Sequence, residues 1–136
     1  MSAEANKRLV SRFVDEWLNA RDRATLGEIC YAGFEFHWGF LGDGRGVEAL
    51  AEKENLVRAA FPDLRVEPAF TVADDRFVVN RSTVTGTHDG VFLGHPPTGR
   101  RATWSAVEIY RIEDGLIAEQ WLNEDWALLL RVITPS

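Results

Sequence analysis

The chain has 136 residues, of which 46% are hydrophobic, and this fits one compact domain with a sizeable core. Its 15 basic and 21 acidic residues give a formal net charge of −6, which argues against a nucleic-acid partner because phosphate binding needs a positive face. Cys30 is the only cysteine, which excludes an intramolecular disulfide and a thiolate zinc cluster.

The first expected element is an amphipathic helix over residues 4–20, followed by a short helix at about 25–29. Apolar residues recur at helical spacing in the first of these: Val10, Phe13, Val14, Trp17 and Leu18. Six charged residues in the first twenty exclude a signal-peptide core. No apolar run approaches the roughly 18 residues of a membrane span. We therefore expect a cytoplasmic protein with no membrane partner.

The next element is a strand in FEFHWGF, residues 34–40, where apolar and polar side chains alternate. Phe34, Phe36, Trp38 and Phe40 are expected on one face, with Glu35 and His37 on the other. GDGRG reads as a turn, and a second long helix is expected over 46–60, ended by Pro62.

After this helix the periodicity changes from 3.6 to 2, which predicts strands at about 64–73, 76–88, 101–112 and 115–124. The two prolines of GVFLGHPPTG make the connector before the third of these a stiff bridge, which we interpret as architectural. Helices followed by consecutive strands indicate an α+β fold. A curved antiparallel sheet wrapped over the helices would leave a space between the layers for a ligand pocket.

The stretch GHPPTGRR, followed after one strand by R-I-x-D-G-x-I-x-E-x-W, resembles the SnoaL-like polyketide cyclase and ester cyclase family of the nuclear transport factor 2-like superfamily. EWLNA, FEFHWG and VRAAFPDL match in order and spacing, so the resemblance covers nearly the whole chain. It implies one SnoaL-like domain over residues 1–136. It also implies a cone-shaped α+β barrel with one deep pocket, a homodimer or tetramer, and chemistry without metal or organic cofactor. Characterised members close a ring by aldol condensation of a polyketide ester.

The resemblance also implies site residues. The family histidine on the strand after PPTGRR falls at Glu108, and a pocket residue falls at Ala106. The first-strand polar position falls at His37, the aromatic residue of the first helix at Trp17, and a specificity-linked helix position near Lys53. The catalytic aspartate falls on Leu122. Only a bulge or a shift would bring Asn123 or Asp125 into that place.

Glu108 is therefore the main catalytic candidate. It shares one strand face with Trp104, Ala106 and Tyr110. If that face lines the pocket, loss of hydration raises the pKa of the carboxyl towards neutral pH, as a general acid/base requires. The alternative is an outward face on which Glu108 forms an ordinary cross-strand ion pair.

Other candidates each have a structural alternative. His37 either forms an acid/base pair with Glu108 across the pocket or is a hydrogen-bonded structural residue. His88 either lines the pocket or pins the end of its strand. Asp125 is either catalytic or the cap of the helical turn DWALLLR. Lys53 either contacts substrate or lies on a solvated helix face. His37, His88 and His95 show no HxH or HExxH spacing, so we expect no metal site.

Two functions compete at the pocket. The first is a cofactor-independent acid/base enzyme of the polyketide cyclase or isomerase type, acting on a hydrophobic cyclic or polyketide substrate. The expected substrate contacts are Trp17, Trp38, Lys53, His88, Trp104, Trp121 and Asn123. The second is a non-catalytic protein that binds a small hydrophobic ligand. A third reading is a scaffold module whose exposed sheet forms a homo-oligomer.

Overall fold

The structure, a computed structural model, describes residues 2–134. Its helices are α1 (Ala3–Arg12), α2 (Arg23–Ile29), α3 (Val47–Ala60) and α4 (Trp126–Ile133). Helix α1 runs directly into a π-helical segment, η1 (Phe13–Asn19), so the long N-terminal helix expected over 4–20 is present but changes its winding halfway. None of the helices in residues 2–134 is both long and apolar enough to cross a membrane.

Six strands form one sheet. They are β1 (Cys30–His37), β2 (Asp43–Arg45), β3 (Arg65–Ala73), β4 (Phe77–Thr87), β5 (Arg101–Glu113) and β6 (Leu116–Glu124). Their spatial order is β2-β1-β6-β5-β4-β3. Four neighbouring pairs are antiparallel, as expected, but β1 and β6 pair in parallel. These two strands are far apart in the chain, so no tight turn forces them to run in opposite directions. The sheet is therefore mixed, and it is not closed into a barrel.

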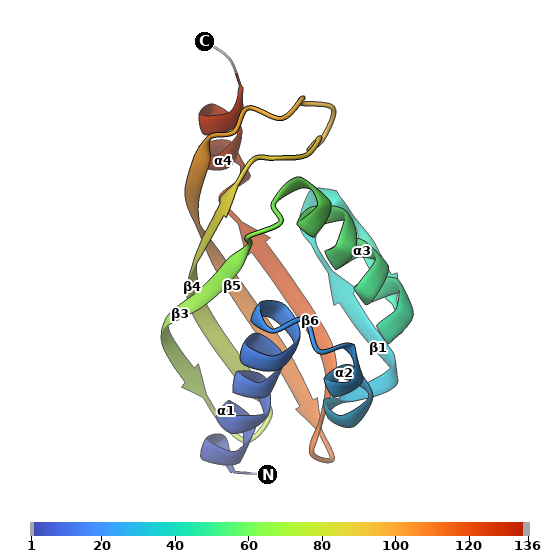
Figure 1. Cartoon of the computed structure of the whole chain (residues 1–136). Helices are drawn as coiled ribbons and strands as arrows, with labels where there is room; N and C mark the ends of the chain where they lie inside the picture. Colours follow the sequence, from blue (N-terminus) through green and yellow to red (C-terminus); the bar gives the residue numbers. More distant parts are fainter. Residues whose placement is uncertain (1, 135–136) are drawn as a thin grey trace.

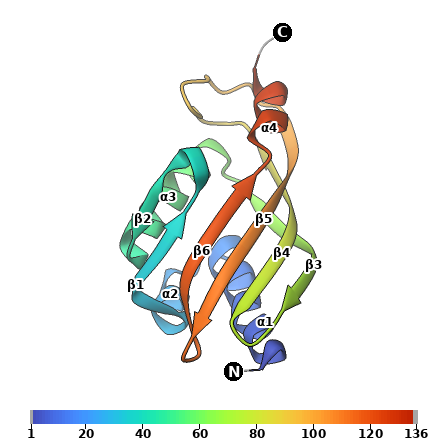
Figure 2. The same ribbon diagram turned by 180° about the vertical axis from the view of Figure 1, so that it is seen from behind.

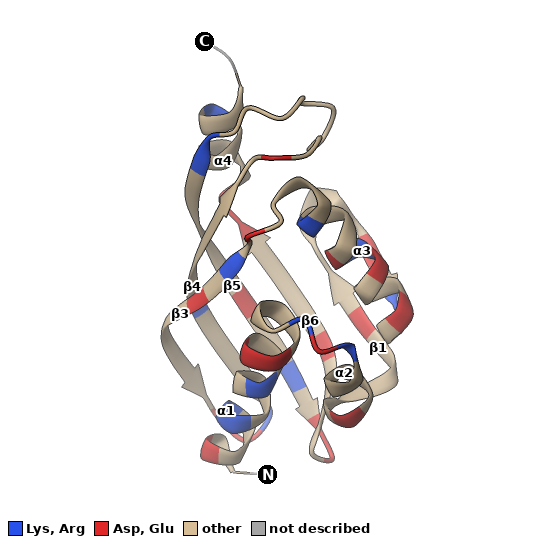
Figure 3. Cartoon of the chain, viewed as in Figure 1, with Lys and Arg blue, Asp and Glu red and all other residues tan. Residues whose placement is uncertain are grey.

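The sheet is curved, and α1, α2 and α3 lie against one of its faces (Figure 1). The other face carries no helix over most of its area (Figure 2). Aromatic side chains fill the space between the layers, as where Phe13 of η1 meets Tyr110 of β5 with ring centroids 5.3 Å apart. Basic and acidic positions are mixed along the helices, and acidic positions also occur on the strands behind them (Figure 3). The expected α+β fold, a curved sheet packed on N-terminal helices, is confirmed.

The first strand differs from its prediction at both ends. It begins at Cys30 and stops at His37, after which the chain turns into a short 3₁₀ segment, η2 (Gly39–Leu41). Phe34, Phe36 and Trp38 are buried, but Phe40 is 60% exposed because the alternation ends before it. The segment GDGRG is more than a turn, since it contains β2, which pairs with β1.

The connector between β4 and β5 packs at the same end of the sheet as α4 (Figure 1). Phe92 and His95 exchange backbone hydrogen bonds, and the Phe92 ring packs on Phe61 and Trp126. At Gly90 an added Cβ would lie 2.1 Å from the carbonyl oxygen of Ala59, so only glycine allows the connector to approach α3 this closely.

Candidate functional site

A cavity lies between the helices and the inner face of the sheet. Side chains from η1, α3, the following connector and strands β3 to β6 line it: Leu18, Glu54, Val57, Leu64, Val66, Val84, Ala106, Glu108, Gln120, Leu122 and Glu124, together with Trp38 just after β1. The cavity volume is about 40 Å³, room for roughly two or three water molecules. It is a narrow, largely apolar site with a few polar groups.

Glu108 lies in the wall of this cavity. Its side chain belongs to the inward-facing set of β5 together with Trp104, Ala106 and Tyr110, and Glu108 is only 2% exposed. Ser82 on β4 donates a hydrogen bond to its Oε2 at 3.1 Å. Burial raises the pKa of Glu108 to about 7, although hydrogen bonds from Ser82 and Asn80 act in the opposite direction. The outward-facing alternative for this strand face is excluded.

Two further glutamates line the same cavity. Glu54 lies on the inner side of α3 and is 6% exposed, and Glu124 lies near the end of β6. Burial raises the pKa of Glu54 to about 7 and that of Glu124 to about 8. The negative charge of Glu108 adds to both shifts, so we expect the titrations of the three groups to influence one another.

Among the residues that the structure describes, no lysine, arginine or histidine lines the cavity. The cation that acts most on Glu54 is Arg58, one turn later on α3. Its guanidinium is engaged elsewhere, because Nη2 donates to the carbonyl oxygens of Trp17 and Leu18 at 2.9 and 3.2 Å. Those carbonyls lie in the last turn of η1, so Arg58 caps the π-helical segment. Within residues 2–134, none of the three cavity glutamates forms an ion pair.

Indole groups hold the polar side chains of β6 in place. Nε1 of Trp104 donates to Oε1 of Glu124 at 2.8 Å, and Nε1 of Trp38 donates to Oε1 of Gln120 at 2.9 Å. These bonds satisfy both buried indoles and fix Glu124 and Gln120 at the cavity wall. Of the predicted substrate contacts, Trp38 lines the cavity, whereas Trp104 lies beside it and hydrogen-bonds Glu124.

Leu122 lies in the cavity wall, directly opposite Glu108 in the β5–β6 pairing. The position to which the resemblance assigns the family aspartate therefore belongs to this site, but its side chain is apolar. Neither candidate replacement occupies it. Asn123 is exposed on the other face of the strand, and Asp125 is the N-cap of α4, where its side chain accepts a hydrogen bond from the Leu128 amide at 3.1 Å.

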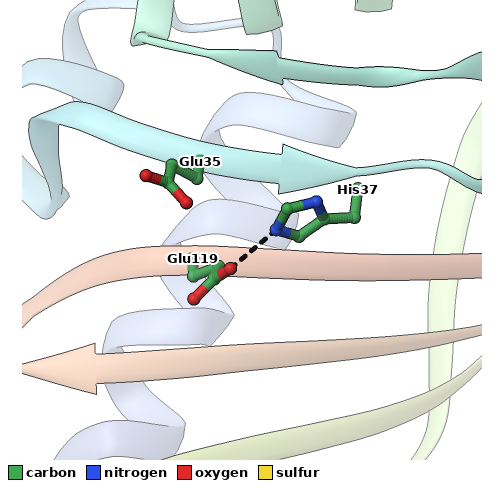
Figure 4. Close-up of side chains that lie close together, drawn as sticks. All are labelled: Glu35, His37 and Glu119. Atoms are coloured by element: carbon green, nitrogen blue, oxygen red, sulfur yellow. Dashed lines mark hydrogen bonds and ion pairs between the residues drawn. The ribbon is translucent and has the colours of Figure 1, made fainter.

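His37 lies on the opposite face of the sheet from Glu108, so the predicted acid/base pair across the pocket does not form. Phe36 and Trp38 point inward, and His37 alternates with them. Its Nε2 lies 2.6 Å from Oε2 of Glu119 (Figure 4). Its ring stacks on Trp121 with centroids 5.6 Å apart. The hydrogen bond with Glu119 raises the pKa of His37. Trp121, expected at the pocket, belongs to this outer face as well.

The other predicted contacts lie away from the cavity. Trp17 is buried beneath Arg58, whose guanidinium carbon is 4.4 Å from the ring centroid. His88 is fully buried at the end of β4, where Nδ1 lies 3.0 Å from the Thr98 hydroxyl, so it pins the strand to the connector. Lys53 is half-buried beside a separate surface groove formed with the connector.

The sequence arguments missed Glu54 and Glu124, although each left a usable signal. Glu54 follows Leu50 by four residues, so it falls on the buried side of α3. Glu124 follows Leu122 by two residues, so it shares a strand face with the position of the family aspartate.

Comparisons with known proteins agree with this architecture. The model of the family described as SnoaL-like polyketide cyclase matches residues 8–133. A candidate SnoaL-like polyketide cyclase from Jannaschia sp. CCS1 has a solved structure with a TM-score of 0.90 and 26% identity, over 98% of this chain and 95% of that one. The structure of IdmH, a candidate polyketide cyclase from Streptomyces antibioticus, has a TM-score of 0.84 and 27% sequence identity, over 95% of this chain and 98% of that one. The structure of TsrD from Streptomyces laurentii has a TM-score of 0.86 and 25% identity, over 98% of each chain. No curated protein matches the sequence.

Proposed function

The chain belongs to the SnoaL-like polyketide cyclase family, and from this premise we propose that it is a cofactor-independent acid/base enzyme of the cyclase or isomerase type. Its substrate would be a hydrophobic cyclic or polyketide ketone. The observation that carries the proposal is the convergence of Glu54, Glu108 and Glu124 on one cavity, with pKa values raised to about 7, 7 and 8. Groups that titrate near neutral pH can both accept and donate protons under physiological conditions.

Enolisation needs a base for the carbon-bound proton and a hydrogen-bond donor for the enolate oxygen, and two of the glutamates supply them. In its ionised form Glu108 removes the proton from the carbon next to the substrate carbonyl. Glu124, which has the highest pKa of the three, is still protonated and donates a hydrogen bond to the developing enolate oxygen. In a cyclase the enolate carbon attacks a second carbonyl, and the alkoxide that forms takes the proton held by Glu108. In an isomerase Glu108 returns that proton to another carbon of the enolate. Either way the glutamates return to their starting protonation, and no redox step is involved.

The width of the cavity limits how much substrate it accepts. A volume of about 40 Å³ holds a carbonyl and its neighbouring carbon, whereas pockets for whole drug-sized ligands measure about 300–1,000 Å³. We expect the remainder of the substrate to displace the apolar side chains of Val57 and Leu64, which lie on α3 and on the connector that follows it.

Leu122 supports the second candidate function, a non-catalytic protein that binds a small hydrophobic ligand. An apolar side chain at the position of the family aspartate would leave binding intact and remove chemistry by the known route. In that case Glu108 only satisfies a polar group of the ligand.

Proton exchange distinguishes the two functions without knowledge of the product. Cyclic and β-dicarbonyl ketones are incubated with the protein in D₂O, and loss of the signal from the proton next to the carbonyl is followed by NMR. An enzyme accelerates exchange for at least one ketone that it binds. Glu108→Gln should then lower that rate by about 10² or more and leave the dissociation constant within a few-fold. Glu113→Gln, an exposed carboxylate on the same strand, serves as the matched control. Tight binding of a ketone without any acceleration would favour the binding protein.

A further inference from the structure

Three side chains with metal-binding atoms meet on the outer face of the sheet, on the other side from the cavity (Figure 4). Glu35 and His37 alternate on β1 and point outward, and Glu35 is paired with Glu119 across the parallel contact between β1 and β6. One possible ligand atom from each residue lies within 4.8 Å of the other two. Because adjacent strands carry all three, the sheet fixes their backbone positions.

Neighbouring residues orient two of these side chains as a metal ion requires. Nδ1 of His37 lies 3.4 Å from a carboxylate oxygen of Asp43 on β2, which leaves Nε2 directed at Glu119. Nε of Arg111 on β5 donates to Oε1 of Glu119 at 3.2 Å, which leaves Oε2 directed at His37. Metal-binding histidines commonly direct their second nitrogen to a carboxylate, and ligating carboxylates are hydrogen-bonded in turn.

We propose that Glu35, His37 and Glu119 bind one divalent transition-metal ion, with Zn²⁺ the best fit. An imidazole nitrogen with two carboxylate oxygens suits Zn²⁺, whereas Mg²⁺ and Ca²⁺ prefer oxygen ligands alone. With bonds of about 2.0–2.1 Å, ligand atoms in a tetrahedral site lie about 3.3 Å apart. The present separations, from 2.6 Å between His37 and Glu119 to at most 4.8 Å, bracket that distance. We expect rotation of the two glutamate side chains to bring the ligand atoms to this distance and water to take the fourth position.

The surrounding charges are compatible with this ion. The side chain of Arg45 is 74% exposed and lies 3.7 Å from Glu35, so it can move into solvent without disturbing the core. Arg111 keeps its bond to Oε1 of Glu119, because the ion uses the other oxygen. The ion replaces the proton shared by Nε2 of His37 and Oε2 of Glu119, and that proton passes to solvent. The bound ion then cross-links β1 to β6.

This site is independent of the chemistry proposed for the cavity, and calorimetry tests it directly. Chelator-treated full-length protein is titrated with ZnCl₂, and the melting temperature is measured with and without the ion. We expect saturable binding of one Zn²⁺ per chain and a higher Tm, because the ion binds only the folded arrangement. MgCl₂ at the same concentration should leave the Tm unchanged. His37→Asn and Glu119→Gln should each weaken Zn²⁺ binding at least tenfold.

Three further variants distinguish loss of the metal site from loss of folding and from unspecific Zn²⁺ binding. Glu35→Gln alters a half-exposed side chain and so leaves folding intact, and it should also weaken binding. His95→Asn and Glu67→Gln remove a histidine and an exposed carboxylate outside the cluster, and both should bind Zn²⁺ as the wild type does. The proposal is overturned if the wild type shows no saturable heat and no rise in Tm. Wild-type affinity in the folded Glu35→Gln and Glu119→Gln proteins would likewise overturn it.

Discussion

Replacing Glu108 with glutamine should change how the stability of the protein depends on pH. Burial raises the pKa of this carboxyl from its ordinary value of 4.5 to about 7. One pKa unit corresponds to about 1.4 kcal/mol, so the difference amounts to about 3 kcal/mol of folding free energy. The folded state binds the proton more tightly than the unfolded state. The contribution is therefore fully present below pH 4.5 and is lost as the pH rises through about 7.

Glutamine has nearly the same shape and does not titrate. The free energy of unfolding of Glu108→Gln, relative to wild type, should therefore rise by about 3 kcal/mol between pH 4.5 and pH 8. Urea unfolding at a series of pH values, followed by tryptophan fluorescence and far-UV circular dichroism, measures this difference. Groups that titrate identically in both proteins cancel. The remaining difference in unfolding free energy comes from the titration of Glu108 and from the effect of its charge on the pKa values of Glu54 and Glu124.

A difference that stays flat across this range would refute the reasoning, because it would mean that Glu108 remains hydrated in the folded protein. Glu113→Gln removes an exposed carboxylate near the end of the same strand. It should give the wild-type profile and so control for the loss of one formal charge.

Three other substitutions test separate features by urea unfolding. Trp38→Phe leaves the buried carbonyl of Gln120 without its donor and should cost about 1–3 kcal/mol; an unchanged midpoint would mean that water replaces the indole. Asp125→Ala removes the cap of α4 and should cost about 0.5–2 kcal/mol without altering proton exchange at a substrate, whereas loss of exchange at unchanged stability would make Asp125 catalytic. Gly90→Ala places a Cβ 2.1 Å from the Ala59 carbonyl oxygen and should cost about 1–3 kcal/mol, unless the connector moves away from α3 freely.

Local periodicity predicted most of the elements, because each helix or strand buries one face. The alternation in FEFHWGF also separated His37 from the aromatic face of β1. Since that face is the buried one, the pattern already indicated that His37 points outward. The family position placed His37 at the pocket, in conflict with this pattern. The alternation of side chains along β5 does not say which face of the strand is buried, so it left the burial of Glu108 open. The family resemblance favoured the inward face, which is the correct one.

Pairing between distant segments could not be read from the sequence. The parallel contact of β1 with β6 brings Glu35 and His37 to Glu119, and nothing in the spacing of either strand indicates it. Glu54 reaches the cavity of Glu108 because α3 packs over the sheet, which local patterns do not describe. Glu124 reaches it through the pairing of β5 with β6. Histidine spacing alone does not indicate the cluster of Glu35, His37 and Glu119, because two of its three side chains are glutamates.

The central claim is that three glutamate carboxyls share one desolvated cavity, and a carboxyl titration tests it most directly. The protein is labelled with ¹³C at the glutamate side-chain carboxyl, and chemical shifts are followed by NMR from pH 3 to 9. The signals of Glu54, Glu108 and Glu124 are assigned through their Glu→Gln variants. We expect these three to titrate near pH 7–8 in overlapping, coupled steps. Titration of all three near pH 4.5 would contradict the account.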